Sequence, residues 1–289
     1  MHTRLHLAAS LFSAGTIALA IPVRTTAAQT PSAHFPTNED LRHTRALGDP
    51  HLSPDGRSVL FTVTEPTVAG ASTHFWVADV GANTSRQITF ALAGSKGSER
   101  AGAWSPDGRT IYFLARRGKH TQLYRLPMNG GEAEPIAIKL VPSVDASIEP
   151  DAVAGSKAKT PPDSVEADVS NYEISPDGRT AAVVVRDPET PGEAKQKTDR
   201  ADAIAVDQDR HGTRAYLLDL SSLKVTPVGV APDVGEIAWS HRGDRLVVVT
   251  RPMNGAGDLG PADKVWIVDV ANAASPKQLT QMPATARHA

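Results

Sequence analysis

Three aspartates recur in the same short motif, and these repeated carboxylates are the first feature of the sequence that could do chemistry. Asp55, Asp107 and Asp177 each stand third in a Ser-Pro-Asp-Gly stretch. Carboxylates gathered in one place can bind cations or transfer protons. The motif itself favours turn formation, because proline fixes φ at the second position of a type I turn, aspartate suits the third and glycine supplies a positive φ. We therefore expect turns here rather than a carboxylate cluster.

Other chemical signals are weaker. Asp207-Gln-Asp-Arg-His-Gly212 has the opening spacing of a calcium loop, but Leu218 stands where that loop needs a glutamate. The ten histidines are scattered without zinc-binding spacing, cysteine is absent, and no Gly-x-Ser-x-Gly nucleophile elbow occurs. Gly94-Ser-Lys-Gly97 is too short for a phosphate loop. The sequence thus predicts no catalytic residue, no cofactor-binding residue and no metal ligand.

The turns belong to a repeat that is present in four copies. An apolar residue precedes each turn and a β-branched or aromatic run follows it, which is typical of strand, tight turn and strand. The four copies begin at Leu52, Trp104, Ile174 and Trp239. An apolar strand and a short fourth element follow each hairpin, and Asn129-Gly130-Gly131 is expected to join these two elements in the second copy. Four strands joined by hairpins form the blade of a β-propeller.

The predicted fold is therefore all-β, a propeller of four-stranded blades with about four blades, forming an incomplete ring. The alternative is a β-sandwich with coincidental turns. We expect blades at 51–90, 101–138, 171–229 and 235–281. Aromatic residues recur at one position of the third strand, where core packing is the expected role and ligand stacking the alternative: Trp76, Tyr124, Tyr216 and Trp266.

Two insertions interrupt the repeat. Residues 139–171 are rich in proline and scattered charge, and residues 186–213 lie inside the third blade. Long loops at one end of a propeller commonly bind ligands, and they can equally be decoration. The pattern leaves both interpretations open.

Bulk composition excludes several function classes. The chain has 289 residues, enough for a sizeable core, and a formal net charge of -2 from 30 basic and 32 acidic residues. No excess of positive charge favours nucleic acid as a partner. The absence of cysteine removes disulfides and thiol chemistry together.

The N-terminus has the pattern of an export signal. Arg4 precedes an apolar run from Leu5 to Val23, and small residues follow up to Ala28. We expect a signal peptide at 1–28, with cleavage after Ala28 or, second, near Ala20. A lead-in segment at 29–50 and a propeller at 51–289 would follow. An uncleaved anchor is the alternative, although the apolar run is short and interrupted by polar residues. The prediction is a secreted or periplasmic protein with no membrane span after signal removal.

These motifs resemble the propeller of the prolyl oligopeptidase family of serine peptidases, in its dipeptidyl-aminopeptidase and acylaminoacyl-peptidase branch. The same blade unit occurs in TolB-like periplasmic proteins. The resemblance covers roughly Asn38 to Thr280, and its most specific part is the entry from Glu39-Asp40-Leu41 through Gly48-Asp49-Pro50 to the first turn. In that family the propeller gates substrate access to a following α/β-hydrolase domain.

The resemblance implies a propeller that is inactive alone. No family catalytic residue can be carried over, because the sequence contains neither a nucleophile elbow nor a βαβ pattern. We expect the non-catalytic, substrate-gating or protein-binding portion of a secreted prolyl-oligopeptidase-like peptidase, truncated before the hydrolase domain. The alternatives are a self-contained TolB-like binding propeller and an enzyme with an unrecognised site. Expected partners are a peptide or protein ligand, a separate or missing hydrolase domain, and a second copy of the chain by self-association.

Overall fold

Short strands separated by tight turns build almost the entire described chain. The structure, a computed structural model, describes residues 35, 37–67, 70–90, 99–141, 164–189, 198, 211–251 and 263–281. The expected signal peptide at 1–28 lies outside these residues. One short helix, α1 (Asn38–Arg42), precedes the strands, and Thr37 caps it by accepting a hydrogen bond from the Asp40 amide. No helix among the described residues has the length and apolar character needed to cross a membrane.

Four four-stranded antiparallel sheets follow one another along the chain, and in each sheet the strands pair in sequence order. The first sheet contains β1 (Ala46–Leu52), β2 (Ser58–Thr67), β3 (Gly70–Asp79) and β4 (Thr84–Gln87). The second contains β5 (Glu99–Trp104), β6 (Thr110–Ala115), β7 (Gln122–Pro127) and β8 (Glu134–Ile136). The third contains β11 (Val169–Ile174), β12 (Thr180–Arg186), β13 (Thr213–Asp219) and β14 (Val225–Pro227). The fourth contains β15 (Val234–Trp239), β16 (Arg245–Thr250), β17 (Lys264–Asp269) and β18 (Lys277–Gln281).

Two small elements complete the described chain. A two-stranded ribbon of β9 (Lys139–Leu140) and β10 (Val165–Glu166) lies between the second and third sheets in sequence, and the 3-10 helix η2 (Val270–Asn272) joins β17 to β18. The expected insertion at 139–171 therefore opens and closes with strand, although its residues 142–163 lie outside the described part. Of the insertion at 186–213, residues 190–197 and 199–210 also lie outside it.

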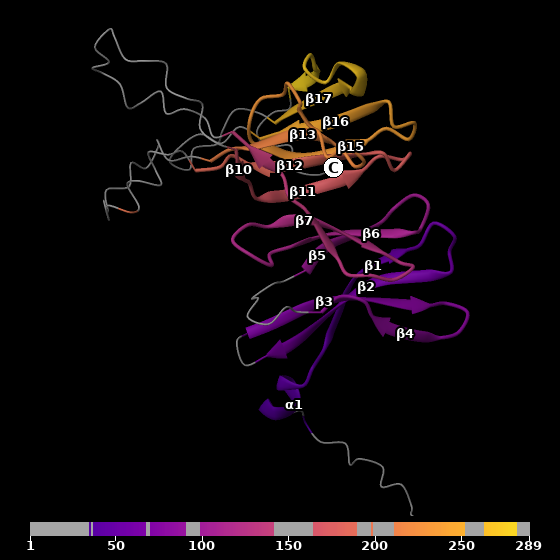
Figure 1. The fold of residues 1–289 in the computed structure, drawn as a ribbon. Helices are drawn as coiled ribbons and strands as arrows, with labels where there is room; N and C mark the ends of the chain where they lie inside the picture. The colour runs from indigo at the N-terminus through magenta and orange to yellow at the C-terminus, as the bar shows by residue number, and fades with distance from the viewer. Residues whose placement is uncertain are drawn as a thin grey trace, which may run out of the picture.

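The four sheets are the blades of an incomplete propeller, which confirms the predicted fold class. Figure 1 shows them stacked face to face from the indigo N-terminal end to the yellow C-terminal end, with the first and fourth sheets at opposite ends of the stack. Below we call them blades 1 to 4 in chain order. Blade 1 begins at Ala46, five residues before the expected start of the first blade.

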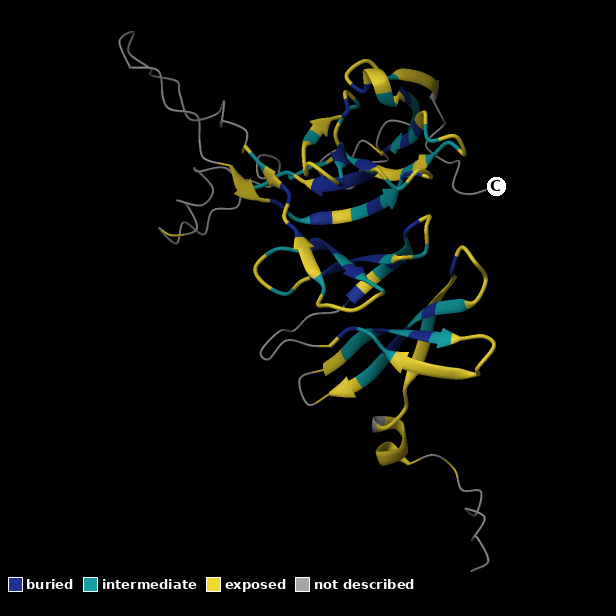
Figure 2. Ribbon diagram, turned by 45° about the vertical axis from the view of Figure 1, so that its right-hand side comes forward, coloured by how far each residue is buried: buried dark blue, intermediate teal, exposed yellow. Residues whose placement is uncertain are grey.

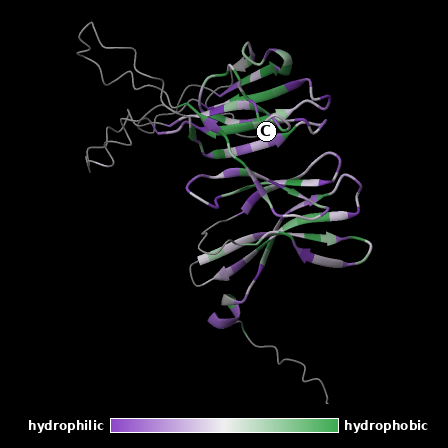
Figure 3. Cartoon of the chain, in the orientation of Figure 1, coloured by the Kyte–Doolittle hydropathy of each residue, from purple (hydrophilic) through white to green (hydrophobic). Residues whose placement is uncertain are grey.

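Three hydrophobic clusters hold consecutive blades together, one at each interface. Leu60 and Phe75 of blade 1 meet Ile111 and Phe113 of blade 2. The second cluster joins blades 2 and 3, and the third joins blades 3 and 4. Figure 2 shows the consequence, because the inner strands of the middle blades are mostly dark blue while blade 1 is largely teal and yellow. Hydrophobic segments coloured green in Figure 3 follow the same central strands.

The Ser-Pro-Asp-Gly segments form the turns that the sequence predicts. Each glycine has a positive φ, from 69° at Gly108 to 71° at Gly56, and its amide donates to the carbonyl of the serine three residues earlier, as at Gly108 and Ser105 (2.9 Å). The predicted turn at Asn129-Gly130-Gly131 is also confirmed, with φ of 116° and 114° at the two glycines. L-residues with side chains rarely adopt these angles, so glycine is required here.

The order of strands separates two kinds of connection. In an antiparallel meander, the first and third turns of a blade lie at one end and the second turn lies at the other, together with the crossing to the next blade. The tight turns therefore share one end of the propeller, which we call the turn end. Both insertions, at 139–171 and 186–213, belong to the opposite end, which we call the loop end.

Candidate binding surfaces

The recurring aspartates are structural components of their turns. In blade 2, Asp107 accepts a hydrogen bond from the Ser105 hydroxyl at 2.6 Å and another from the Arg109 amide at 3.1 Å. The same two bonds, at the same lengths, occur at Asp55 and Asp177. The serine hydroxyl, followed by the amide, holds the pKa of each of these aspartates below its usual value. Each carboxylate is therefore used within its own turn.

The turns of neighbouring blades stack on one another. A Cβ added to Gly178 would lie 3.4 Å from Cδ of Pro106, and one added to Gly243 would lie 3.4 Å from Cδ of Pro176. Beside this stack, the turns of blades 2 and 3 border a hollow of about 370 Å³ that Asp107, Tyr112 and Asp177 help to line. In the part of the chain that the structure describes, no group of three or more acidic, histidine or cysteine residues could hold a metal ion.

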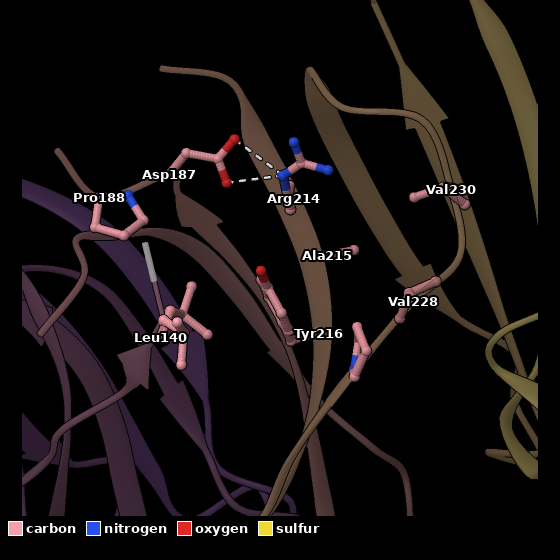
Figure 4. A pocket seen from close by; sticks show the side chains of 10 residues that line it. Leu140, Asp187, Pro188, Arg214, Ala215, Tyr216, Val228 and Val230 are labelled. Carbon is pink, nitrogen blue, oxygen red and sulfur yellow. Dashed lines mark hydrogen bonds and ion pairs between the residues drawn. The ribbon is translucent and has the colours of Figure 1, made fainter. Parts of the chain in front are cut away.

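A pocket at the loop end is formed where the two insertions leave the propeller (Figure 4). Its volume is about 220 Å³. Leu140 and Val141 begin one insertion, Asp187 and Pro188 begin the other, and Arg214 follows the second insertion. The described roots of the two insertions therefore share one pocket, which was not predicted from the sequence.

Arg214 provides the main polar group of this pocket. Its Nε lies 2.8 Å and 2.9 Å from the two carboxylate oxygens of Asp187, and Figure 4 shows its two terminal nitrogens pointing away from that carboxylate. The guanidinium side chain is 44% exposed. The hydroxyl of Tyr216 points toward the same space, and burial raises its pKa. These donors face apolar walls from Leu140 and Val228.

This arrangement suits a small amphipathic ligand. The guanidinium can donate hydrogen bonds to a carboxylate, and such charge-assisted bonds are among the strongest that proteins form. The apolar walls can take an aliphatic or aromatic side chain. Sequence reasoning did not select Asp187 and Arg214. The available signal was a pair of opposite charges at the two ends of one insertion.

A buried polar cluster links blades 1 and 2. Glu99, only 3% exposed, accepts a hydrogen bond from Nη2 of Arg117 at 2.7 Å and another from the Thr89 hydroxyl. The Arg117 guanidinium also stacks on the Tyr124 ring, 4.9 Å from its centroid. The charged pair is thus surrounded by packed side chains, where it fixes the entry of the chain into blade 2.

The same cluster contains a hydroxyl, an imidazole and a carboxylate in series. Ser72 Oγ lies 2.8 Å from His74 Nε2, and His74 Nδ1 lies 3.5 Å from Glu99 Oε2. A catalytic triad needs a hydrogen bond between acid and imidazole, and His74 Nδ1 has no hydrogen-bond partner among the described residues. Arg117 already compensates the charge of Glu99. The series therefore lacks the contacts that would make the Ser72 hydroxyl a nucleophile.

The recurring aromatic residues take different positions. Tyr124 is buried between blades 1 and 2, while Tyr216 and Trp266 pack against the next two interfaces. These three fulfil the predicted core role. Trp76 belongs to none of the three clusters and is half-buried on the outer face of blade 1. The calcium-like stretch begins with residues 207–210, which lie outside the described part.

Comparisons with known proteins agree with this fold. No family model matches the sequence, and no curated protein matches it significantly. Among solved structures, an acylaminoacyl peptidase from Pyrococcus horikoshii has a TM-score of 0.53 and 14% identity, and the match covers 83% of this chain and 33% of that one. TolB from Acinetobacter baumannii has a TM-score of 0.46 and 18% identity, covering 81% of this chain and 44% of that one. A puromycin-hydrolyzing peptidase from Mycobacterium tuberculosis has a TM-score of 0.48 and 16% identity, covering 84% and 30%.

The chain therefore shares the propeller fold of the acylaminoacyl peptidase. The peptidase with the TM-score of 0.53 carries this conclusion, which concerns the fold. This chain spans 33% of the length of that peptidase and 44% of the length of TolB. The predicted resemblance is therefore confirmed for the fold.

Proposed function

We propose that this chain is the non-catalytic propeller portion of a secreted serine peptidase of the prolyl oligopeptidase kind, which binds or gates peptides for a hydrolase domain. The observation that carries the proposal is the shared fold with an acylaminoacyl peptidase at a TM-score of 0.53, in a match that covers 33% of that peptidase. The sequence contains no Gly-x-Ser-x-Gly elbow. A gating propeller needs none, since its contribution is recognition.

The loop end is the proposed binding surface. Both insertions start there, and their described roots enclose the pocket of Asp187, Arg214 and Tyr216. Arg214 would hold a carboxylate of the peptide, and the apolar wall at Leu140 and Val228 would hold a neighbouring side chain. The same chemistry would serve a self-contained binding propeller of the TolB kind, so the two candidates differ in whether a hydrolase works with the chain.

The proposed location is outside the cytoplasm, in the medium or the periplasm. The support is the apolar run that precedes Ala28. N-terminal sequencing of exported material is expected to begin near Gln29. Soluble protein that retains Met1 in the cytoplasm would contradict this location.

Catalytic inactivity is tested with a fluorophosphonate probe on the purified chain. No serine should be labelled. This includes Ser72, whose hydroxyl contacts the His74 imidazole, because no carboxylate is hydrogen-bonded to that imidazole to orient it as a base. Stoichiometric labelling that Ser72→Ala abolishes would overturn the proposal. The DNA that follows codon 289 is expected to encode a hydrolase domain in frame or in the adjacent gene. A stop codon with no hydrolase nearby would replace the proposal with the self-contained binding propeller.

Peptide binding is tested by calorimetry with a leucine-phenylalanine dipeptide, acetylated at its N-terminus and free at its carboxylate. Arg214→Gln should weaken binding by roughly tenfold or more, because a hydrogen bond to a charged group is lost. The matched control is Arg125→Gln. Arg125 lies on the equivalent strand of blade 2, is 43% exposed and pairs with Glu134. The amidated dipeptide should bind as weakly as the free dipeptide binds to Arg214→Gln. Equal losses in both variants would exclude the pocket.

A further inference from the structure

The interfaces between consecutive blades are built from two unlike halves. We call the face that a blade turns toward the next blade its following face, and the face that it turns toward the previous blade its preceding face. The following face of one blade packs on the preceding face of the next, and this happens three times in the chain. The preceding half has an aromatic side chain near its centre, as with Tyr124 in blade 2 and Trp266 in blade 4. The following half is aliphatic in blade 3, where Val184 and Leu217 form part of it. In blades 1 and 2 the following half also contains one aromatic residue, Phe75 and Tyr112 respectively. The two halves come from opposite faces of a blade, so the interface is heterologous.

Blade 1 carries a preceding half that no described blade covers. Strand register places Phe61 and Trp76 opposite each other, as it does Phe113 and Tyr124 in blade 2. Phe113 is 0% exposed, whereas Phe61 and Trp76 are only half-buried. Val59 and Ala78 extend this surface, since they occupy the positions of two buried residues of blade 2, Ile111 and Leu126. We call this surface the first end face.

The edge of blade 1 also lacks contacts that the later blades make. Trp104 and Trp239 donate their indole N–H to a carbonyl of the preceding blade, at 3.1 Å and 3.0 Å. Leu52 stands at their position and is 62% exposed. The later turn glycines pack on a proline of the preceding turn, whereas a Cβ at Gly56 would meet nothing within 4 Å.

Blade 4 carries the complementary half. Val247 and Val249 alternate with the buried Leu246 and Val248, so they point away from blade 3. They pair across strands with residues of β17 that share their face, Ile267 and Val265. All four are half-buried and aliphatic, as the following half in blade 3 is. We call this surface the second end face.

We infer that two copies of this chain associate head to tail, with the second end face of each copy on the first end face of the other. The pairing continues the interface that the chain already repeats three times, in which the following face of one blade packs on the preceding face of another. Each copy has one half of each kind, so a closed pair buries all four faces. Repeat proteins normally cap their ends with polar residues, and these ends are apolar.

Two copies fit the number of blades that the structure describes. Propellers contain roughly four to eight blades, and two copies of four blades make eight. Three copies would exceed that range. Within one copy, blades 1 and 4 lie at opposite ends of the stack (Figure 1). Heterologous contacts close into rings when the rotation permits and extend into filaments when it does not. If two unlike faces meet, a variant blocked at one face should still associate with a variant blocked at the other face. Contact between identical faces does not predict this.

The test is light scattering coupled to size exclusion on the purified chain and on two variants. The unaltered chain should elute at twice the mass of one chain. Phe61→Lys blocks the first end face and Val247→Lys blocks the second, and each variant should be a monomer, with association weakened by roughly 30-fold or more. Phe90→Lys is the matched control, because Phe90 is an exposed aromatic residue that follows β4 and is not among the residues of the first end face. It should remain a dimer.

Mixing the two variants gives the decisive result. An equimolar mixture should recover a dimer, because one intact face of each kind remains. A dimer of Phe61→Lys alone would mean contact between two second end faces and would overturn the inference. A monodisperse monomer of the unaltered chain that does not bind ANS would overturn it too. Circular dichroism checks that both variants fold. If Phe61→Lys unfolds, the milder Trp76→Gln takes its place.

Discussion

Gly102→Ala tests the packing between blades 1 and 2 at its tightest point. A Cβ at this position would lie 2.4 Å from Cε1 and 2.7 Å from Cζ of Phe75, and 3.0 Å from Leu60. Real Cβ atoms do not approach other atoms so closely, so Phe75 must move. Its ring is 0% exposed and meets the Phe113 ring at 5.5 Å between centroids, which leaves it no free space to enter.

The expected cost follows from measurements on overpacked cores. Extra methyl groups in a filled core cost about 1 to 3 kcal/mol. For a domain of this size, each kcal/mol lowers the melting temperature by about 2 to 4 °C. Gly102→Ala should therefore lower it by roughly 2 to 12 °C. The matched control is Gly118→Ala, because a Cβ there meets nothing within 4 Å. Its melting temperature should change little, or rise slightly as the unfolded chain loses entropy.

Calorimetric unfolding of both variants, and of each in a Phe75→Leu background, measures the effect. The smaller leucine should reduce the cost of Gly102→Ala, which would appear as a coupling free energy in the double-mutant cycle. Equal melting temperatures for the Gly102 and Gly118 variants would refute the reasoning. The interface between blades 1 and 2 would then be looser than the structure has it.

Three further outcomes are expected from unfolding experiments. Gly108→Val should destabilise by roughly 1 kcal/mol or more through its positive φ, and Arg109→Ala much less; equal shifts would contradict the turn. Arg117→Ala should cost about 3 to 5 kcal/mol because it leaves Glu99 charged and buried, and adding Glu99→Gln should recover part of that loss. Burial raises the pKa of Glu173 above 4.5, so the folded state holds its proton more tightly and stability falls as pH rises through that raised pKa. Glu173→Gln should therefore melt above the unaltered chain near pH 7 but not near pH 4, and a pH-independent difference would contradict this explanation.

The blade plan could be predicted from sequence because it is local. Pro106, Asp107 and Gly108 determine a turn through their own backbone preferences, and alternation after the turn determines which face is apolar. The same reasoning could not find the irregularities of the first strands. In every blade the pairing of the first two strands shifts register, as between Arg100 and Ala103. Alternation of apolar residues indicates which face of a strand is buried, but it does not indicate where an extra residue enters the pairing.

Sequence reasoning did not find the two pairs of charged residues for a related reason. Glu99 and Arg117 stand at the two ends of a hairpin, and only the folded sheet brings them to 2.7 Å. Asp187 and Arg214 are separated by an entire insertion. Charged residues next to strand ends usually face solvent, so their types gave no signal that one pair is buried and that the other borders a pocket. The alternation that predicts blades also identifies the end faces, because it is preserved at Val59 and Val247, where no further blade follows among the described residues.

The fourth turn shows which residues the turn geometry requires, because it keeps the geometry without the proline and the usual aspartate. Its sequence is Ser240-His-Arg-Gly-Asp244, without the proline and with arginine at the usual aspartate position. The geometry persists, with φ of 71° at Gly243 and the Ser240 hydroxyl bonded to an aspartate at 2.8 Å. That aspartate is Asp244, which follows the glycine instead of preceding it. Because a carboxylate can move along the turn while its bond to serine is kept, what the turn requires is a local acceptor. A catalytic or metal-binding carboxylate could not change position in this way, so any function of the chain is better sought at the loop end and at the two end faces.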